Sequence, residues 1–306
     1  IPLDAKWTQH GVTVAGGNGQ GSNLNQLERV VGFYIDDDDD QTLYIADHGN
    51  QRIMKWKRDA TSGQLVAGGN GVGNKSNQLN YPTDVILDKQ TDSLIICDSS
   101  NRRVVRWPRH DGKSGETIVL NVKCADLAMD DEGSLYVSDV ENHEVRRWRM
   151  GEKNGTVVAG GNGQGNRRDQ LDYPQSVVVD QDHSVYVSDW RNHRVMKWMK
   201  GAKECIIMAG GNGKGDALTQ LHYPNGLFVD RLNTVYVTDS ENNRIMRWPQ
   251  GATSGSIIVD GNQKGYQGKE LDDLKGLSFD RHGNLYVVDF WRHRVQKFLI
   301  ELSPHN

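Results

Sequence analysis

The sequence predicts an all-β fold, a six-bladed β-propeller whose blades are four-stranded antiparallel sheets. One observation is a repeated segment: versions of residues 185–198 occur six times, and the aspartates within them lie 51, 41, 50, 50 and 50 residues apart. A period near fifty residues is typical of repeat architectures such as propellers. The other observation is that each repeat holds short apolar segments rich in β-branched residues, without a sustained helical period. The blades are centred on Asp47, Asp98, Asp139, Asp189, Asp239 and Asp289.

Each repeat is expected to contain four short strands, called a, b, c and d in chain order. In the fourth repeat they cover residues 176–180, 184–189, 194–198 and 205–209. Because the joints between them are only a few residues long, neighbouring strands must run antiparallel. One such sheet is too small to bury its faces alone, so successive sheets are expected to stack around a ring.

The two ends of the chain are expected to close this ring. The sixth repeat stops after its third strand at residues 296–298, whereas residues 11–17 have the pattern of a fourth strand with no repeat before them. The N-terminal strand is therefore expected to complete the last blade, which removes an exposed strand edge. Residues 1–306 are expected to form a single domain that is monomeric in isolation.

Composition and charge narrow the possible partners. The formal net charge of −4 provides no general attraction to polyanions, so nucleic-acid binding would need a local basic face. No run of about 18 apolar residues is present, so membrane insertion is not expected. No charged and apolar leader precedes Ile1, and the absence of an initiator methionine suggests processing or excision from a larger protein, which leaves the compartment open.

The three cysteines, Cys97, Cys124 and Cys205, are too few and too irregularly spaced for a disulfide framework or a zinc site. Each lies in an apolar strand segment. We therefore expect each to be a small buried hydrophobic residue.

The repeated segment resembles the NHL repeat. It follows the pattern Tyr-Val-x-Asp-x-x-Asn-x-Arg-Val/Ile-x-Lys/Arg-Trp, with Tyr-Pro before strand a, over nearly the whole chain. The resemblance implies the propeller fold, and members of the family include ubiquitin-ligase substrate readers, RNA readers, extracellular sensor domains and a peptide-amidating lyase. In the lyase relatives, zinc-binding histidines follow the proline at the entrance to strand a. Here those places hold Thr83, Gln175 and Asn225, so the resemblance to the lyase ends at the fold and argues against an enzyme.

The polar residues of the repeat are expected to be scaffold. Asp189 and Arg194 should form a charge-assisted pair across the b–c hairpin. Asn192 lies where the turn needs a residue that tolerates positive φ. The third repeat differs, since Glu144 replaces the arginine opposite Asp139. This repeat also lacks the glycine loop that precedes strand a in its neighbours, so a notch is expected on one rim.

The acidic run 36–40 lies between strands a and b of the first repeat. Its spacing does not match an EF-hand loop, although calcium binding is conceivable. A solvated hairpin tip is the expected structure.

One face of the propeller is expected to bind the ligand. Strand direction alternates, so the b–c turns and the d–a glycine loops must emerge together, and loops on a rigid scaffold commonly carry function. The b–c turns hold Trp190 and Arg191 in the fourth repeat, and Phe290, Trp291 and Arg292 in the sixth. The expected channel mouth adds Thr83, Gln175, Asn225 and Lys275.

These residues predict a non-catalytic module that binds a protein or peptide. Exposed aromatic rings beside arginine suit protein contact and also single-stranded RNA, so an RNA-binding NHL domain remains an alternative. Packing of these rings against neighbouring loops is the other interpretation. A second alternative is a metal-dependent hydrolase or lyase at the channel mouth that uses Asp84, Asp126 and Asn225, with Asp84 and Asp126 as candidate ligands of a divalent cation. The other interpretation is that these side chains only form hydrogen bonds with water in the channel. Apart from that cation, no cofactor is expected.

Overall fold

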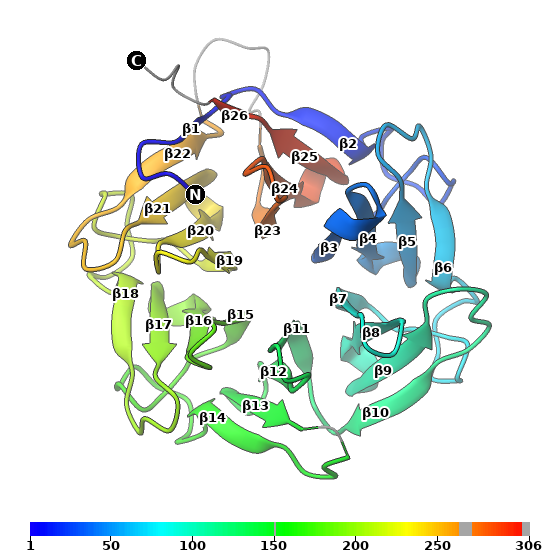
Figure 1. Ribbon diagram of the computed structural model, residues 1–306, viewed down its shortest axis with the longest axis horizontal. Coiled ribbons are helices and arrows are strands. Elements are labelled where there is room, and N and C mark those ends of the chain that lie inside the picture. Colours follow the sequence, from blue (N-terminus) through cyan, green and yellow to red (C-terminus); the bar gives the residue numbers. More distant parts are fainter. Residues whose placement is uncertain (150, 263–270, 302–306) are drawn as a thin grey trace.

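The computed structural model describes residues 1–149, 151–262 and 271–301. Within these ranges, six four-stranded antiparallel sheets form a ring of blades (Figure 1). The predicted fold class is therefore confirmed. No helix in the described part of the chain is long and apolar enough to cross a membrane.

Blades 1 to 5 each run from the inner strand a to the outer strand d in chain order. Blade 1 comprises β3 (Phe33–Asp36), β4 (Thr42–Asp47), β5 (Arg52–Trp56) and β6 (Gln64–Gly68). Blade 2 comprises β7 (Pro82–Asp88), β8 (Ser93–Asp98), β9 (Arg103–Pro108) and β10 (Glu116–Leu120). Blade 3 comprises β11 (Cys124–Met129), β12 (Leu135–Asp139), β13 (Glu144–Trp148) and β14 (Thr156–Gly160). Blade 4 comprises β15 (Pro174–Val179), β16 (Val185–Asp189), β17 (Arg194–Trp198) and β18 (Ile206–Gly210). Blade 5 comprises β19 (Pro224–Val229), β20 (Val235–Asp239), β21 (Arg244–Trp248) and β22 (Ser256–Asp260).

The last blade joins the two ends of the chain, as predicted. Its inner strands are β23 (Leu274–Phe279), β24 (Leu285–Asp289) and β25 (Arg294–Phe298), and its outer strand is the N-terminal β2 (Val12–Gly16). A further two-stranded sheet pairs β1 (Lys6–Trp7) with β26 (Ile300–Glu301) (Figure 1). Both pairings satisfy strand edges that would otherwise be exposed.

Hydrophobic clusters lie between neighbouring blades rather than within one blade. One cluster, for example, combines Tyr186 and Val195 of blade 4 with Leu227 and Val237 of blade 5. A single blade cannot bury its own faces, so each blade depends on its neighbours for a core. Short 3-10 turns occur at two positions. One follows strand a in blade 1, η1 (Asp37–Asp39). The others follow strand b in five blades: η2 (His48–Asn50), η3 (Ser99–Asn101), η4 (Trp190–Asn192), η5 (Ser240–Asn242) and η6 (Phe290–Arg292).

The predicted pair across the b–c hairpin is present. Asp189 faces Arg194 in the register, and the Arg194 Nε donates to Asp189 Oδ2 at 2.7 Å. The residue with positive φ is His193, at 54°, and not Asn192, so that expectation was displaced by one residue. Asn192 instead lies in the 3-10 turn, where its Nδ2 donates to Asp189 Oδ2 at 2.9 Å.

The expectation for the cysteines was wrong for two of the three. Cys97, at the end of β8, and Cys124, at the start of β11, form a disulfide with a Cα–Cα distance of 5.5 Å. Both are buried, but they link blades 2 and 3 covalently. Cys205 is free and buried, and burial raises the pKa of its thiol to about 11. That thiol is therefore protonated and unreactive at neutral pH.

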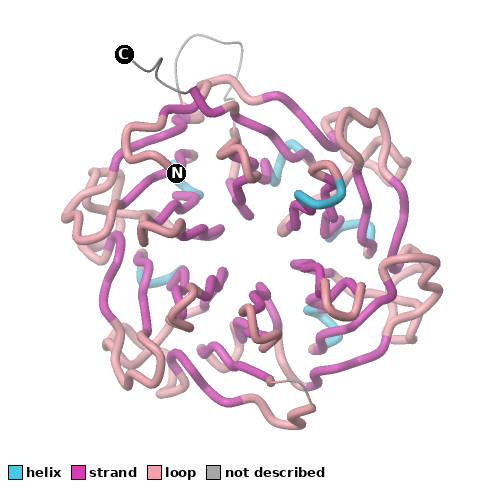
Figure 2. Tube along the Cα trace, in the orientation of Figure 1, coloured by secondary structure: helices cyan, strands magenta, loops and turns pink. Residues whose placement is uncertain are grey.

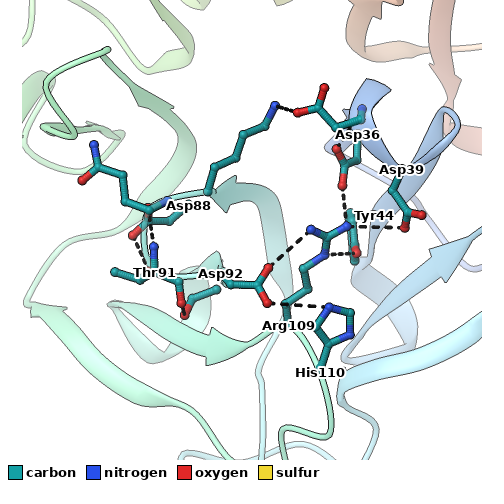
Figure 3. A network of polar contacts seen from close by, with 12 residues as sticks. Asp36, Asp39, Tyr44, Asp88, Thr91, Asp92, Arg109 and His110 are labelled. Atoms are coloured by element: carbon teal, nitrogen blue, oxygen red, sulfur yellow. Dashed lines mark hydrogen bonds and ion pairs between the residues drawn. The ribbon is translucent and has the colours of Figure 1, made fainter.

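The acidic run is not simply a solvated tip. Asp36 is buried, and its Oδ2 accepts a hydrogen bond from Arg109 Nη2 at 2.5 Å. Figure 3 shows the Arg109 guanidinium between Asp36 and Asp39 of blade 1 and Asp92 of blade 2. Asp38 is exposed but pairs with Lys89 of blade 2 at 2.6 Å. The run therefore joins two blades on the face opposite the glycine loops.

Candidate functional site

The inner strands surround a cavity of about 640 Å³ along the propeller axis. Thr83, Gln175 and Asn225 line this cavity, as predicted for residues at the entrance of strand a. Lys275 is not among its lining residues. Its ammonium instead pairs with Asp273 Oδ1 at 2.9 Å.

The two candidate metal-binding carboxyl groups join neighbouring blades. Asp84 Oδ2 accepts a hydrogen bond from the backbone N–H of Leu127 at 3.1 Å. Asp126 Oδ2 accepts from Ser176 Oγ at 2.6 Å and from the Val177 N–H at 2.8 Å. Among the described residues, no group of three or more histidine, cysteine or acidic side chains is arranged to hold a metal ion. The same oxygens that suggested a cation site thus hold the inner strands together.

Burial changes the ionisation of this pair. Burial raises the pKa of Asp84 well above its ordinary value, and the neighbouring Asp126 carboxyl raises it further. Burial also raises the pKa of Asp126, although hydrogen bonds from Asp84 and Ser176 oppose that shift. Protonation of Asp84 removes the repulsion between the two carboxylates.

We expect Asp84→Asn to remove a pH dependence of stability. Because the pKa of Asp84 is raised on folding, its stabilising contribution is complete below its unfolded pKa and is lost as pH rises through the folded pKa. As pH rises from the unfolded pKa of an aspartate, about 4, through the raised folded pKa, wild type should lose stability relative to D84N. Urea unfolding of both proteins across this range measures the difference. A constant difference would show that Asp84 does not titrate there.

The first aromatic cluster on the loop-rich face is built around Trp190, and we call it the Trp190 cluster. The Trp190 ring stacks on Tyr223 with centroids 4.3 Å apart, and it lies 5.6 Å from Tyr173. The Arg191 guanidinium carbon lies 4.9 Å from the centre of the Tyr173 ring, and Lys214 Nζ lies 5.8 Å from that of Tyr223. The cluster therefore spans the turns of blade 4 and the entrance to blade 5.

Histidines of the repeat position the tyrosines of this cluster. Tyr173 and Tyr223 precede prolines and have φ of 62° and 53°. Their backbone N–H groups donate to His143 Nδ1 at 3.1 Å and to His193 Nδ1 at 3.2 Å. An accepting Nδ1 requires a neutral imidazole, and burial accordingly lowers the pKa of His193. These histidines join consecutive blades and set the direction of each tyrosine.

The second cluster is built around Phe290 and Trp291, and we call it the Phe290 cluster. The two rings meet edge to face at 4.8 Å, and Trp291 is 51% exposed. The Arg29 guanidinium carbon lies 5.6 Å from the centre of the Trp291 ring, and Lys275 Nζ lies 5.3 Å from that of Phe290. The predicted Arg292 is half-buried, with Nε 3.9 Å from Asp289 Oδ2.

Both clusters lie on the face of the b–c turns and d–a loops. Trp190 and Phe290 begin the turns η4 and η6, which follow strand b, and the turns are spaced around the ring (Figure 2). Sequence reasoning found Trp190, Arg191, Phe290 and Trp291 but missed Tyr173, Tyr223, Arg29 and Lys214. The Tyr-Pro dipeptide before strand a was the available signal, since it places a ring at three of the six entrances, at Tyr81, Tyr173 and Tyr223.

Comparison with known proteins identifies the repeat. A profile of the NHL repeat matches residues 122–148, 171–198, 221–248 and 271–298. No curated protein matched the sequence.

Several solved structures have a similar fold at low sequence identity. An auxiliary nutrient binding protein from Bacteroides thetaiotaomicron is 13% identical, with a TM-score of 0.72 over 97% of this chain and 78% of that one. A gluconolactonase from Xanthomonas campestris is 13% identical, with a TM-score of 0.67 over 98% and 97%. Virginiamycin B lyase from Staphylococcus aureus is 9% identical, with a TM-score of 0.59 over 96% and 99%. At these identities the likeness concerns the fold alone.

Proposed function

Because the chain is a six-bladed NHL-repeat β-propeller, we propose that it is a non-catalytic module that binds a protein or peptide through its loop-rich face. Proteins of this fold include one called a nutrient binding protein and others called lyase or lactonase. Fold therefore does not decide between binding and catalysis, and the arrangement of side chains must do so.

The observation that carries the proposal is the pair of aromatic clusters with adjacent cations. Trp190 and Trp291 are held by rigid turns on one face, and each lies beside an arginine. Large rings with a positive neighbour bury much area at low entropic cost, and Trp, Tyr and Arg dominate the energetics of protein interfaces. The half-exposed Trp291 is the clearest anchor.

Two features favour a binding role over a metal-dependent hydrolase or lyase. The carboxyl oxygens of Asp84 and Asp126 already accept hydrogen bonds from the next blade. His143 and His193 use Nδ1 for the same purpose. Side chains that hold the scaffold in this way are poorly placed to change partners during a reaction.

Neighbouring carboxylates favour a protein or peptide over RNA. Arg191 Nη1 lies 3.7 Å from Asp172 Oδ1, and Lys275 pairs with Asp273 at 2.9 Å. These acids reduce the positive potential on which phosphate binding depends. A peptide can use both signs of charge together with the rings.

We expect peptides selected against this face to depend on Trp291. Peptides enriched from a displayed library on the immobilised protein should lose about thirtyfold in affinity with W291A, because removing an interface anchor typically costs about 2 kcal/mol. Leu232→Ala is the matched control, since Leu232 is 54% exposed in a joint between strands a and b on the opposite face. Isothermal titration with the selected peptides measures both.

Failure to enrich any peptide, or enrichment of peptides that bind W291A as well as wild type, would contradict the proposed surface. Binding of single-stranded RNA in place of peptides, with affinity that falls steeply with salt, would favour the RNA-reader alternative.

A further inference from the structure

The glycine loops before strand a share one mode of attachment to their blade. In blade 4, the Asn192 side-chain amide donates to one loop carbonyl at 2.8 Å, and the Arg194 guanidinium donates to two more at 2.9 and 3.1 Å. The backbone N–H of Cys205, just before strand d, donates to a fourth at 3.0 Å. The acceptors are four consecutive carbonyls, those of Gly165, Asn166, Arg167 and Arg168. With these four hydrogen bonds the blade therefore contacts the backbone of the loop and not its side chains.

The same four contacts recur in the other blades whose preceding loop the structure describes. The consecutive carbonyls belong to residues 21–24 in blade 1, 73–76 in blade 2 and 215–218 in blade 5. The sequence of these loops varies, while the asparagine, the arginine and the backbone N–H before strand d are always the donors. The attachment is thus a general way for a blade to hold a peptide segment.

Blade 3 keeps two of these donors, the asparagine side chain and the backbone N–H before strand d, but lacks the arginine and the loop. Strand β10 ends at Leu120 and β11 begins at Cys124, so no segment is long enough to cross the blade. The Asn142 side-chain amide is present, and its partner among the described residues is Asp139 Oδ2, at 2.7 Å. The backbone N–H just before strand d belongs to Gly155 in this blade. Among the described residues, no backbone carbonyl accepts a hydrogen bond from it. Glu144, which replaces the loop-binding arginine, pairs with Arg146.

A groove of about 270 Å³ occupies the position of the missing loop, as the short spacing of the third repeat predicted. Its walls include Asn142, Arg146, Trp148, Lys153 and Gly155. Trp148 is 9% exposed, whereas its counterparts in blades 1, 2, 4 and 5 are only 1% or 2% exposed. The groove thus uncovers part of a ring that a loop covers elsewhere.

The exposed charges of the groove are positive. Arg146 is 38% exposed at its side chain, and Lys153 is exposed at the rim, whereas Asp139 at the base is buried. The Arg146 Nη1 donates to Gly155 O at 3.2 Å, which keeps the guanidinium beside the free N–H of that residue. Glu144 balances the Arg146 charge, so Lys153 supplies the positive charge that faces the space together with these donors.

We propose that this groove binds an acidic peptide segment of a partner protein. The segment takes the place that the glycine loops fill in the other blades. Its backbone carbonyls accept from the Asn142 side-chain amide, the Gly155 N–H and the Arg146 guanidinium, and an acidic side chain pairs with Lys153. Backbone hydrogen bonds supply affinity and the charge supplies specificity, as in other modes of peptide recognition. The surface is separate from the two aromatic clusters, so the inference goes beyond the proposed function.

Two synthetic peptides test the proposal with the intact protein. The first has the sequence of residues 16–27, which carries no charged side chain, and the second carries S22D and N23D. Both should shift the NMR signals of the Gly155 amide and the Asn142 side-chain amide, and the acidic peptide should bind about tenfold more tightly at low salt. Lys153→Glu should remove that advantage. Lys203→Glu is the matched control, because Lys203 occupies the same turn position in blade 4, where the loop is present.

A loop graft tests whether the peptides bind in the groove of blade 3. Insertion of residues 161–170 between Leu120 and Asn121, combined with E144R, should fill the groove from within the chain and abolish binding of both peptides while the protein remains folded. Binding that survives the graft, or no shift at Gly155 and Asn142 with either peptide, would overturn the proposal. Self-association of the wild type that the graft abolishes would assign the groove to a second copy of this chain and overturn the assignment to a partner.

Discussion

Arg194→Met is expected to lower the free energy of unfolding by about 3–5 kcal/mol, the usual cost of removing one partner of a buried ion pair. Asp189 is fully buried and receives hydrogen bonds from Arg194 Nε, the Asn192 side chain and the Asp172 N–H. Burial already raises the pKa of Asp189, and the Arg194 charge is the main influence that opposes this shift. Without that charge, the carboxylate is left uncompensated in the interior.

The loss of stability in R194M should depend on pH, and it should be accompanied by weaker protection of the loop before blade 4. In R194M the folded pKa of Asp189 should lie further above its unfolded pKa than in wild type. The deficit of R194M in free energy of unfolding should therefore shrink as pH falls and Asp189 becomes protonated. Arg194 also donates to the carbonyls of Asn166, Arg167 and Gln170, so amide exchange in the loop before blade 4 should accelerate.

The control for R194M is Arg191→Met, since the Arg191 side chain is 48% exposed and changes at such sites usually alter stability by less than about 0.5 kcal/mol. Urea unfolding gives the free energies, and hydrogen exchange with mass spectrometry gives the loop protection. A loss below about 1 kcal/mol for R194M would show that the pair is not a structural support.

Loss of the Cys97–Cys124 disulfide is expected to lower the free energy of unfolding by about 2–4 kcal/mol. The bond closes a loop between residues separated by 27 positions, and it joins blades 2 and 3 where the glycine loop is missing. In other blades, loop contacts such as Gly63 N–H to Leu24 O strengthen the attachment between blade and chain. At this junction the covalent bond joins the end of β8 to the start of β11.

Thermal unfolding with and without reductant measures the effect, and Ala substitutions at both Cys97 and Cys124 provide the control. The double variant should unfold at the lower temperature in either condition, because reductant has no bond to break. Thiol titration of the unfolded protein should find one thiol without reductant and three with it. Three thiols under both conditions would show that the bond does not form.

Much of the fold was predictable because it depends on local and repeated features. The spacing of Asp139, Asp189 and Asp239 revealed the blades, and short joints required antiparallel neighbours. The unmatched N-terminal strand pattern predicted the pairing of β2 with β25. The missing loop before blade 3 predicted the groove at that place.

The candidate site was less predictable because its contacts cross between blades. Trp190 meets Tyr223 only because blades 4 and 5 are neighbours, although the two residues lie 33 positions apart in the sequence. The carboxyl groups of Asp84 and Asp126 suggested a cation site, and only their contacts with Leu127, Ser176 and Val177 showed their part in the scaffold.

Four features follow from the repeat pattern or from strand direction: the number of blades, their strand order, the closure of the ring and the face that carries the aromatic turns. Three other features became visible only in the folded ring: Cys97 bonds Cys124, His193 supports Tyr223, and the third repeat leaves backbone-binding donors uncovered. These features depend on the distance between side chains of adjacent blades. Such distances are set by how the blades stack against one another, which no single repeat encodes.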